Sequence, residues 1–237
     1  TAFDNSYLQN LDYNFEKAAE ASCLQDGDVD LDRPLCVAFD YNANINWVVC
    51  GQQHGIKALV LKSFYVKYQR KLRELVDDFC QYYRVHRSRE VVYYYDSTAL
   101  GSNYAVSDED FASVICSQFE ANGWSVNRVF IGQPMRHHEK YTIIDQALKG
   151  QKYLMPMINL PNNEALKLAL EHTGIKIGSG GFQKDKSGEK LAESEEDLLE
   201  HRTDGTDAFD TLMLGMFFYP HSSAARGINM GSAAQPI

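Results

Sequence analysis

The stretch Leu35-Cys-Val-Ala-Phe-Asp-Tyr41 is the starting point for predicting the fold of this chain. Its apolar run has the length of a buried strand, and it ends in one carboxylate, Asp40. Two more apolar runs, at residues 46–53 and 58–66, follow with turn residues between them, which is typical of an antiparallel meander. We therefore expect the fold to begin with three consecutive antiparallel strands.

The period of the apolar residues changes after the meander. Residues 68–85 carry apolar side chains at three- and four-residue spacing among charged ones, which predicts an amphipathic helix. The run Val91-Val-Tyr-Tyr-Tyr-Asp96 is again a strand that ends in a carboxylate. Cap residues at 107–110 predict a helix through residue 121, and a fifth strand at 125–131 follows the turn at Asn122-Gly123.

Helices and strands alternate in the rest of the chain. We expect helices at 141–148 and 163–172, an extended segment at 153–158, a hairpin or mobile loop at 174–188, an acidic helix at 193–200 and a last helix that begins near 203–206. No internal repeat is visible. The pattern predicts an α/β fold, in which a mixed central sheet with an antiparallel start is flanked by helices. This order of elements is that of RNase H-like proteins.

Composition limits the organisation of the 237 residues, of which 44% are apolar. We expect a lead-in or linker at 1–34 with a short helix at 14–21, one domain at 35–219 and a disordered tail at 220–237. The net charge of -9 disfavours nucleic-acid binding through an overall positive field. With no apolar stretch of membrane-spanning length and no signal-peptide layout, the sequence predicts a soluble protein without a membrane partner.

The cysteines and histidines do not form a familiar metal motif. The five cysteines (Cys23, Cys36, Cys50, Cys80 and Cys116) are irregularly spaced without a Cys-x-x-Cys pair, which indicates reduced, buried thiols in a cytosolic setting. The doublet His137-His138 lacks further zinc ligands at a usual spacing. We interpret these two histidines as surface residues or as the start of a helix.

Carboxylates stand at the ends of three apolar elements: Asp40, Asp96 and the segment Asp204-Gly-Thr-Asp207-Ala-Phe-Asp210. Each could be an ordinary cap, and the helix dipole explains Asp204 well. If the first and fourth strands are adjacent and parallel, however, two of these acids lie side by side and repel each other unless cations neutralise them. An all-carboxylate site suits Mg²⁺ or Mn²⁺, and two such ions about 4 Å apart can activate water against a phosphodiester.

The motifs Val37-Ala-Phe-Asp40-Tyr, Val92-Tyr-Tyr-Tyr-Asp96-Ser and Asp204-Gly-Thr-Asp207-Ala-Phe resemble those of one family. It is the C-terminal nuclease domain of the large terminase subunit of tailed bacteriophages. The resemblance implies an RNase H-like fold and cleavage of double-stranded DNA with two divalent cations, Mg²⁺ or Mn²⁺. It also implies that Asp40, Asp96 and Asp207 are the catalytic metal ligands, with Asp204 as an auxiliary ligand at the rim.

The same resemblance implies the partners. They are double-stranded DNA, an ATPase motor in the same parent chain, and the portal and small terminase subunit, in the cytoplasm of the host cell. No Gly-x-x-x-x-Gly-Lys-Ser/Thr motif occurs in the sequence. Since the chain opens with Thr1 rather than Met, we expect the motor to be encoded upstream of it.

Charge is segregated along the chain. Residues 57–90 hold nine Lys and Arg against four acids, whereas residues 184–210 hold four bases against ten acids. The basic stretch is interpreted as a solvated helix face. The glycine-rich segment 178–188, with Lys184 and Lys186, is the better candidate for contact with the DNA backbone.

Two alternatives stay open. One is another RNase H-like nuclease, such as a junction resolvase, which would differ in its substrate. The other is a module without catalytic activity that docks partners, in which the acids serve only as caps. Metal binding would separate the second alternative from the nucleases, because a ligand of the folded state raises its stability.

Overall fold

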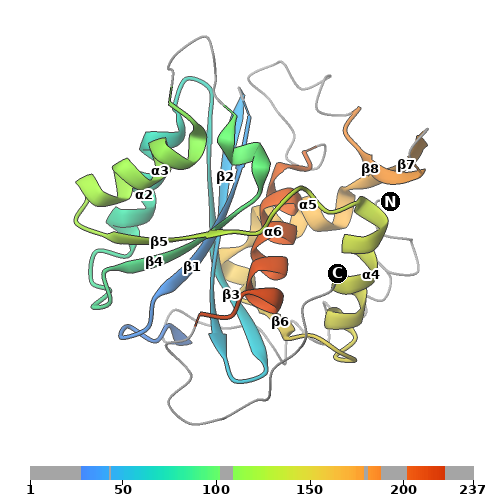
Figure 1. Cartoon of the computed structure of the whole chain (residues 1–237), viewed down its shortest axis with the longest axis horizontal. Helices are drawn as coiled ribbons and strands as arrows, with labels where there is room; N and C mark the ends of the chain where they lie inside the picture. The colour runs from blue at the N-terminus through green and yellow to red at the C-terminus, as the bar shows by residue number, and fades with distance from the viewer. Residues whose placement is uncertain (1–27, 43, 102–108, 179–180, 188–201, 222–237) are drawn as a thin grey trace.

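A six-stranded mixed sheet forms the centre of the computed structural model, which describes residues 28–42, 44–101, 109–178, 181–187 and 202–221 (Figure 1). Its strand order is β5-β4-β1-β2-β3-β6. β1, β2 and β3 pair antiparallel, while β4 pairs parallel with β1, β5 with β4 and β6 with β3. The predicted fold class and the antiparallel start are therefore confirmed. The strands span Leu35–Tyr41 (β1), Ile45–His54 (β2), Lys57–Lys67 (β3), Glu90–Tyr95 (β4), Ser125–Phe130 (β5) and Met155–Ile158 (β6).

Helices cover both faces of the sheet (Figure 1). α2 (Leu72–Tyr82) and α3 (Phe111–Ala121) lie on one face, and α6 (Asp204–Phe218) packs against β1 and β2 on the other, with α5 (Glu164–His172) beside it. Two short 3₁₀ turns, η2 (Ser97–Leu100) and η3 (Leu160–Asn162), follow β4 and β6. α4 (His137–Leu148) begins four residues before the predicted start, because its first turn is polar and the apolar period starts only at Tyr141.

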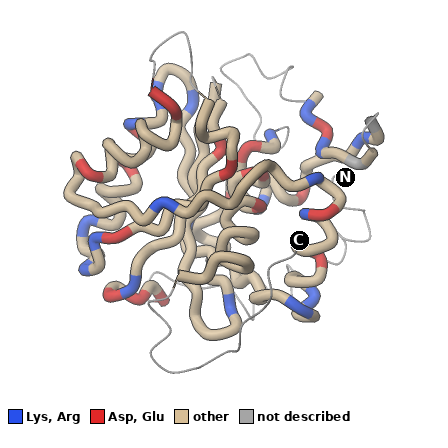
Figure 2. Tube along the Cα trace, viewed as in Figure 1, with Lys and Arg blue, Asp and Glu red and all other residues tan. Residues whose placement is uncertain are grey.

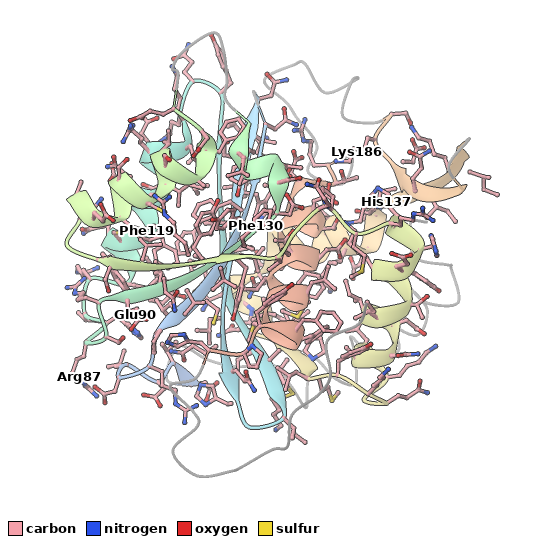
Figure 3. The ribbon with its side chains drawn as sticks, viewed as in Figure 1. Arg87, Glu90, Phe119, Phe130, His137 and Lys186 are labelled. Atoms are coloured by element: carbon pink, nitrogen blue, oxygen red, sulfur yellow. The ribbon has the colours of Figure 1, made fainter. Side chains whose placement is uncertain are left out.

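Three of the nine basic residues at 57–90 form ion pairs with acidic residues. Arg70 binds Asp78 at 2.8 Å, Arg73 binds Glu109 at 2.9 Å, and Arg87 binds Asp32. Lys and Arg gather at the turn between α2 and β4, on the left of Figure 2. Figure 3 places Arg87 far from His137 and Lys186. These pairs fit the interpretation of this stretch as a solvated face.

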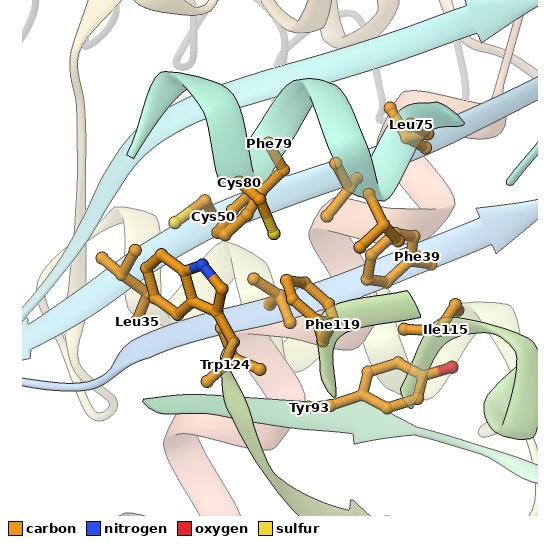
Figure 4. Packing of buried hydrophobic residues seen from close by; sticks show 14 of the residues in the cluster. Leu35, Phe39, Cys50, Leu75, Phe79, Cys80, Tyr93, Ile115, Phe119 and Trp124 are labelled. Carbon is orange, nitrogen blue, oxygen red and sulfur yellow. The ribbon is translucent and has the colours of Figure 1, made fainter. Parts of the chain in front are cut away.

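Side-chain alternation along β1 divides the core into two layers. Val37 and Phe39 point toward α2 and α3, whereas Cys36 and Ala38 point toward α6. The first layer is rich in aromatic rings, as Figure 4 shows. Its fully buried members include Leu35, Cys50, Leu75, Phe79, Tyr93, Ile115 and Phe119. The alternation decides which face each later residue of β1 occupies.

Glycine lets α6 approach the sheet closely. A Cβ atom at Gly215 would lie 2.2 Å from the Tyr94 ring, and one at Gly205 would lie 2.9 Å from the Trp47 indole. The Tyr94 hydroxyl also donates to the Tyr219 carbonyl at 2.9 Å, at the end of the helix. Gly205 thus lets the first turn of α6, which carries Asp207, pack against β2, and Gly215 lets the end of the helix pack against β4.

Residues 174–185 form a separate hairpin of β7 (Gly174–Gly178) and β8 (Gly181–Asp185), which contacts α4. Of the two forms predicted for this segment, the hairpin is thus confirmed. Cys36, Cys50, Cys80 and Cys116 are buried free thiols, as predicted. No helix in the described part of the chain is long and apolar enough to cross a membrane. Cys23, the predicted helices at 14–21 and 193–200 and the tail from 222 lie outside the described residues, so the domain boundaries stay predictions.

Candidate active site

The register between β1 and β4 brings the first two predicted acids together. Ala38 pairs with Tyr94 in this parallel ladder. Asp40 lies two residues further along β1, and Asp96 lies two residues after Tyr94, directly beyond the end of β4. Since side chains alternate with a period of two, both acids belong to the face that α6 covers. The carboxyl ends of two neighbouring parallel strands therefore carry one acid each, as the sequence predicted.

α6 adds the third acid to the same place. A cavity of about 360 Å³ at this edge of the sheet is lined by Asp40, Asp96 and Asp207. His137 and Lys140 of α4 and Lys186, which follows β8, also line it. The three acids come from segments that are far apart in the sequence, yet they share one cavity. Among the described residues, no three His, Cys, Asp or Glu side chains lie close enough as they stand to hold a metal ion.

Asp96 also acts as a cap. Its Oδ1 accepts hydrogen bonds from the Thr98 backbone N–H at 2.9 Å and from the Thr98 hydroxyl at 2.5 Å, at the start of η2. These bonds turn one carboxylate oxygen toward the 3₁₀ turn. The cap and ligand interpretations are compatible, because a carboxylate has a second oxygen.

Asp40 stands in a crowded acidic environment. Burial raises the pKa of Asp40 well above its usual range, and the charges of Asp207 and Asp204 raise it further. A hydrogen bond between the carboxyl groups of Asp40 and Asp204 acts in the same direction, while Lys186 opposes it. A divalent cation would relieve this repulsion, so the oxygen donors fit Mg²⁺ or Mn²⁺.

Lysines hold Asp207 ionised. Its Oδ1 lies 2.8 Å from Lys184 Nζ and its Oδ2 lies 2.6 Å from Lys186 Nζ. Burial raises the pKa of Asp207, but the charges of Lys184, Lys186 and Lys140 outweigh it and hold this pKa well below its usual range. Two ammonium groups thus occupy the carboxylate oxygens that a metal ion would use.

Asp204 differs from its predicted position at the rim. It is only 1% exposed, with its carboxylate 2.8 Å from Arg202 Nε and 3.1 Å from Asn42 Nδ2. The rim placement is wrong because Arg202 and Asn42 draw the side chain inward. Asp210, the neighbouring acid on α6, accepts from Lys184 at 2.7 Å and does not line the cavity.

The two lysines proposed for DNA contact have different environments. The Lys184 side chain is 3% exposed and is enclosed by Asp207, Asp210 and the Thr206 hydroxyl, so its ammonium does not face the surface in this arrangement. The Lys186 side chain is 46% exposed and lines the cavity. Lys186 is therefore the one of the pair that can meet a ligand there.

The contribution of α4 was not expected from the sequence. His137 and Lys140 stand in its first turn, and burial together with the charge of Lys140 lowers the pKa of His137. The available signal was the polar run His137-His-Glu-Lys140 shortly after Pro134, which marks a helix start. Nothing local in that run shows that it faces the carboxylates.

The strand order and directions define an RNase H-like fold of the mixed α/β class. The large terminase of a thermophilic bacteriophage, in complex with ATP-gamma-S, is similar to this chain with a TM-score of 0.53, at 11% identity, over 84% of this chain and 43% of the terminase. The HK97 bacteriophage large terminase has a TM-score of 0.52, at 12% identity, over 84% of this chain and 42% of its own. No protein-family model and no curated protein matches the chain.

The predicted resemblance to large terminases is therefore confirmed for the fold. The chain spans a little over two fifths of the length of these terminases. At this level of identity the likeness concerns the fold, and the roles of individual residues stay predictions.

Proposed function

We propose that this chain is a metal-dependent endonuclease that cleaves double-stranded DNA during the packaging of a phage genome. The observation that carries the proposal is the meeting of Asp40, Asp96 and Asp207 on one cavity at the carboxyl ends of parallel strands. Acids that serve only as helix or turn caps need not lie at one cavity, whereas acids that hold the same catalytic cations must lie close together.

In this proposal, Asp40, Asp96 and Asp207 hold two divalent cations, Mg²⁺ or Mn²⁺. When bound, the cations would supply positive charge that activates a water molecule and stabilises the leaving oxygen of the phosphodiester. Asp204 acts through Asp40, to which it is hydrogen-bonded, and so has an auxiliary role.

The cationic side of the cavity would receive the DNA backbone. Lys186 and Lys140 both line the cavity, and their charges offset part of the repulsion between the acids and a phosphate. Metal binding at Asp207 requires that Lys186 give up its contact with this carboxylate. We infer that the released ammonium then becomes available to a phosphate.

The proposed partners follow from the resemblance to large terminases: an ATPase motor in the parent chain, the portal and the small terminase subunit. The short span of this chain relative to the terminases fits a nuclease part that works together with a motor. The proposed location is the cytoplasm of the host cell.

Nicking of supercoiled plasmid in Mn²⁺ or Mg²⁺, compared with EDTA, tests the activity. Asp40→Asn, Asp96→Asn and Asp207→Asn should each abolish nicking, whereas Asp78→Asn, on the exposed face of α2, should retain it. Activity that persists in EDTA would refute the metal mechanism. Activity that survives all three cavity substitutions would refute the site.

Thermal unfolding with and without Mn²⁺ separates the nuclease from a module that only docks partners. A metal that binds the folded state must raise the unfolding temperature. Branched DNA and RNA–DNA hybrids, offered as competing substrates, test the other RNase H-like activities. If the protein cleaves either of them in preference to linear double-stranded DNA, the proposed packaging substrate is wrong.

A further inference from the structure

The cavity that holds the carboxylates also has an aromatic wall. Tyr41 and Tyr95 end β1 and β4, Phe111 begins α3, and all three line the cavity. By the alternation of the strands, the two tyrosines belong to the α3 face of the sheet, whereas Asp40 and Asp96 belong to the α6 face. The aromatic rings and the acids therefore approach the cavity from different sides.

The rings of this wall stack on one another and on a buried ring behind them. The Tyr41 and Phe111 rings stack at 4.9 Å with an interplanar angle of 2°. Tyr95 stacks on Tyr93 at 5.0 Å, and the Tyr41 and Tyr93 hydroxyls are hydrogen-bonded. Tyr93 is fully buried, but the other three rings stay half-buried. The inner ring supports the outer ones, which remain accessible from the cavity.

The aromatic surface continues toward the edge of the sheet. Phe130, at the end of β5, lies 5.6 Å from the Tyr95 ring and is 46% exposed. Figure 3 shows Phe130 near the middle of the view, with His137 and Lys186 to its upper right. The cavity thus has aromatic rings on one side, cationic side chains from α4 and the hairpin on another, and the carboxylates near both.

This combination matches the chemistry of one nucleotide. The phosphate is an anion that Lys186 and Lys140 can attract, and the base has a flat face that stacks on an aromatic ring. Such stacking tolerates any base, because every base has a π face. In a fully paired duplex, however, both faces of each base are covered by its neighbours, so a base must leave the stack before it can reach a protein ring.

We propose that Tyr41, Tyr95 and Phe111 hold an unstacked base beside the phosphate that is cleaved. The preferred substrate of the site is then DNA that is locally unpaired, such as a frayed end or a melted bubble within a duplex. This inference rests on the proposed nuclease function and adds its substrate requirement.

The test compares cleavage of a plain duplex with cleavage of the same duplex that contains a short unpaired bubble. Wild-type protein should cleave the bubble faster. Tyr95→Leu and Phe111→Leu should each lose about fivefold or more in kcat/KM on the bubble and much less on the plain duplex, since stacking on one ring is worth about 1 kcal/mol or more. Tyr95→Phe, which keeps the ring, should retain the preference.

Tyr153→Leu is the matched control, because Tyr153 stacks on Phe217 and does not line the cavity. It should leave both rates unchanged. Thermal unfolding of each variant shows whether the fold is intact. Equal losses on both substrates, or no preference of the wild type for the bubble, would overturn the proposal.

A second readout does not depend on cleavage. The fluorescent base 2-aminopurine, placed in the bubble and bound to Asp40→Asn protein, should be quenched when it stacks on a ring. Quenching that Tyr95→Leu removes and Tyr95→Phe keeps supports the aromatic wall even if the protein cleaves no DNA, in which case only the nuclease proposal fails. Quenching that is absent, or that persists in Tyr95→Leu, overturns the aromatic wall.

Discussion

Replacement of Lys184 by methionine should destabilise the protein strongly when no metal is present. The Lys184 side chain is 3% exposed, and its ammonium lies 2.8 Å from Asp207 Oδ1 and 2.7 Å from Asp210 Oδ2. Loss of one partner from a buried ion pair costs about 3–5 kcal/mol, because the remaining charge stays buried. At about 2–4 °C per kcal/mol for a domain of this size, the unfolding temperature should fall by roughly 6–20 °C.

Lys186→Met is the matched control, since Lys186 binds the same carboxylate of Asp207 at 2.6 Å but is 46% exposed. Because the Lys186 end of this pair is open to solvent, although Asp207 is only 15% exposed, its loss should cost about 1 kcal/mol, so this variant should lose only a few degrees. The two lysines thus differ in burial more than in contact distance.

Circular dichroism melts in EDTA and in Mn²⁺ measure both variants. Mn²⁺ should raise the unfolding temperature of Lys184→Met more than that of wild-type protein, because the cation replaces the lost ammonium at Asp207. Equal stability of Lys184→Met and wild type in EDTA would refute the role of the buried lysine. Equal losses in the two lysine variants would show that burial does not set the cost.

Three further predictions concern charge, packing and DNA binding. Asp40→Asn should abolish cleavage and, in EDTA at pH 8, unfold at the same or a higher temperature than wild type. Because folding raises the pKa of Asp40, this carboxyl costs stability as the pH rises above its unfolded-state pKa, and the cost is complete above the folded-state pKa. The advantage of Asn should therefore vanish in melts at acid pH, and an advantage that grows with acidity would contradict this reasoning. Gly215→Ala should lower the free energy of unfolding by about 1–3 kcal/mol, because the added methyl group would clash with the Tyr94 ring. An unchanged midpoint in denaturant unfolding would contradict this clash. Because the protein has a net charge of -9, it should bind DNA weakly, with a shallow salt slope and little sequence selection, and binding should depend on Mg²⁺ or Mn²⁺. Tight binding in EDTA, or selection of one short sequence, would be inconsistent with this expectation.

The candidate site divides into a part that local sequence predicts and a part that it does not. The ends of β1 and β4 could be predicted to within one residue from their apolar runs, because a carboxylate interrupts each run: Asp40 is the second-last residue of β1 and Asp96 directly follows β4. Asp40 and Asp96 were therefore predicted at strand ends, and the parallel register places them at one edge. Asp207 was predicted from its position at the start of an apolar helix, and it lines the same cavity.

The partners of these acids could not be predicted in the same way. Asp204 was expected at the rim, yet Asn42, which is 162 residues away in the sequence, helps to bury it. Lys184 was expected to contact DNA, but the packing of the hairpin encloses its ammonium between Asp207 and Asp210.

The sequence by itself determined the order of strands and helices, the acids Asp40 and Asp96 at the ends of two strands and Asp207 at the start of the last helix, because period and element ends are local properties of the chain. Only the tertiary structure decided which cations face these acids and which rings share their cavity. Lys140, Lys186 and Phe111 come from separate elements whose local patterns are those of ordinary helix and hairpin surfaces. Their meeting depends on how α3, α4 and the hairpin pack around the sheet, and long-range packing of this kind leaves no periodic signal in the sequence.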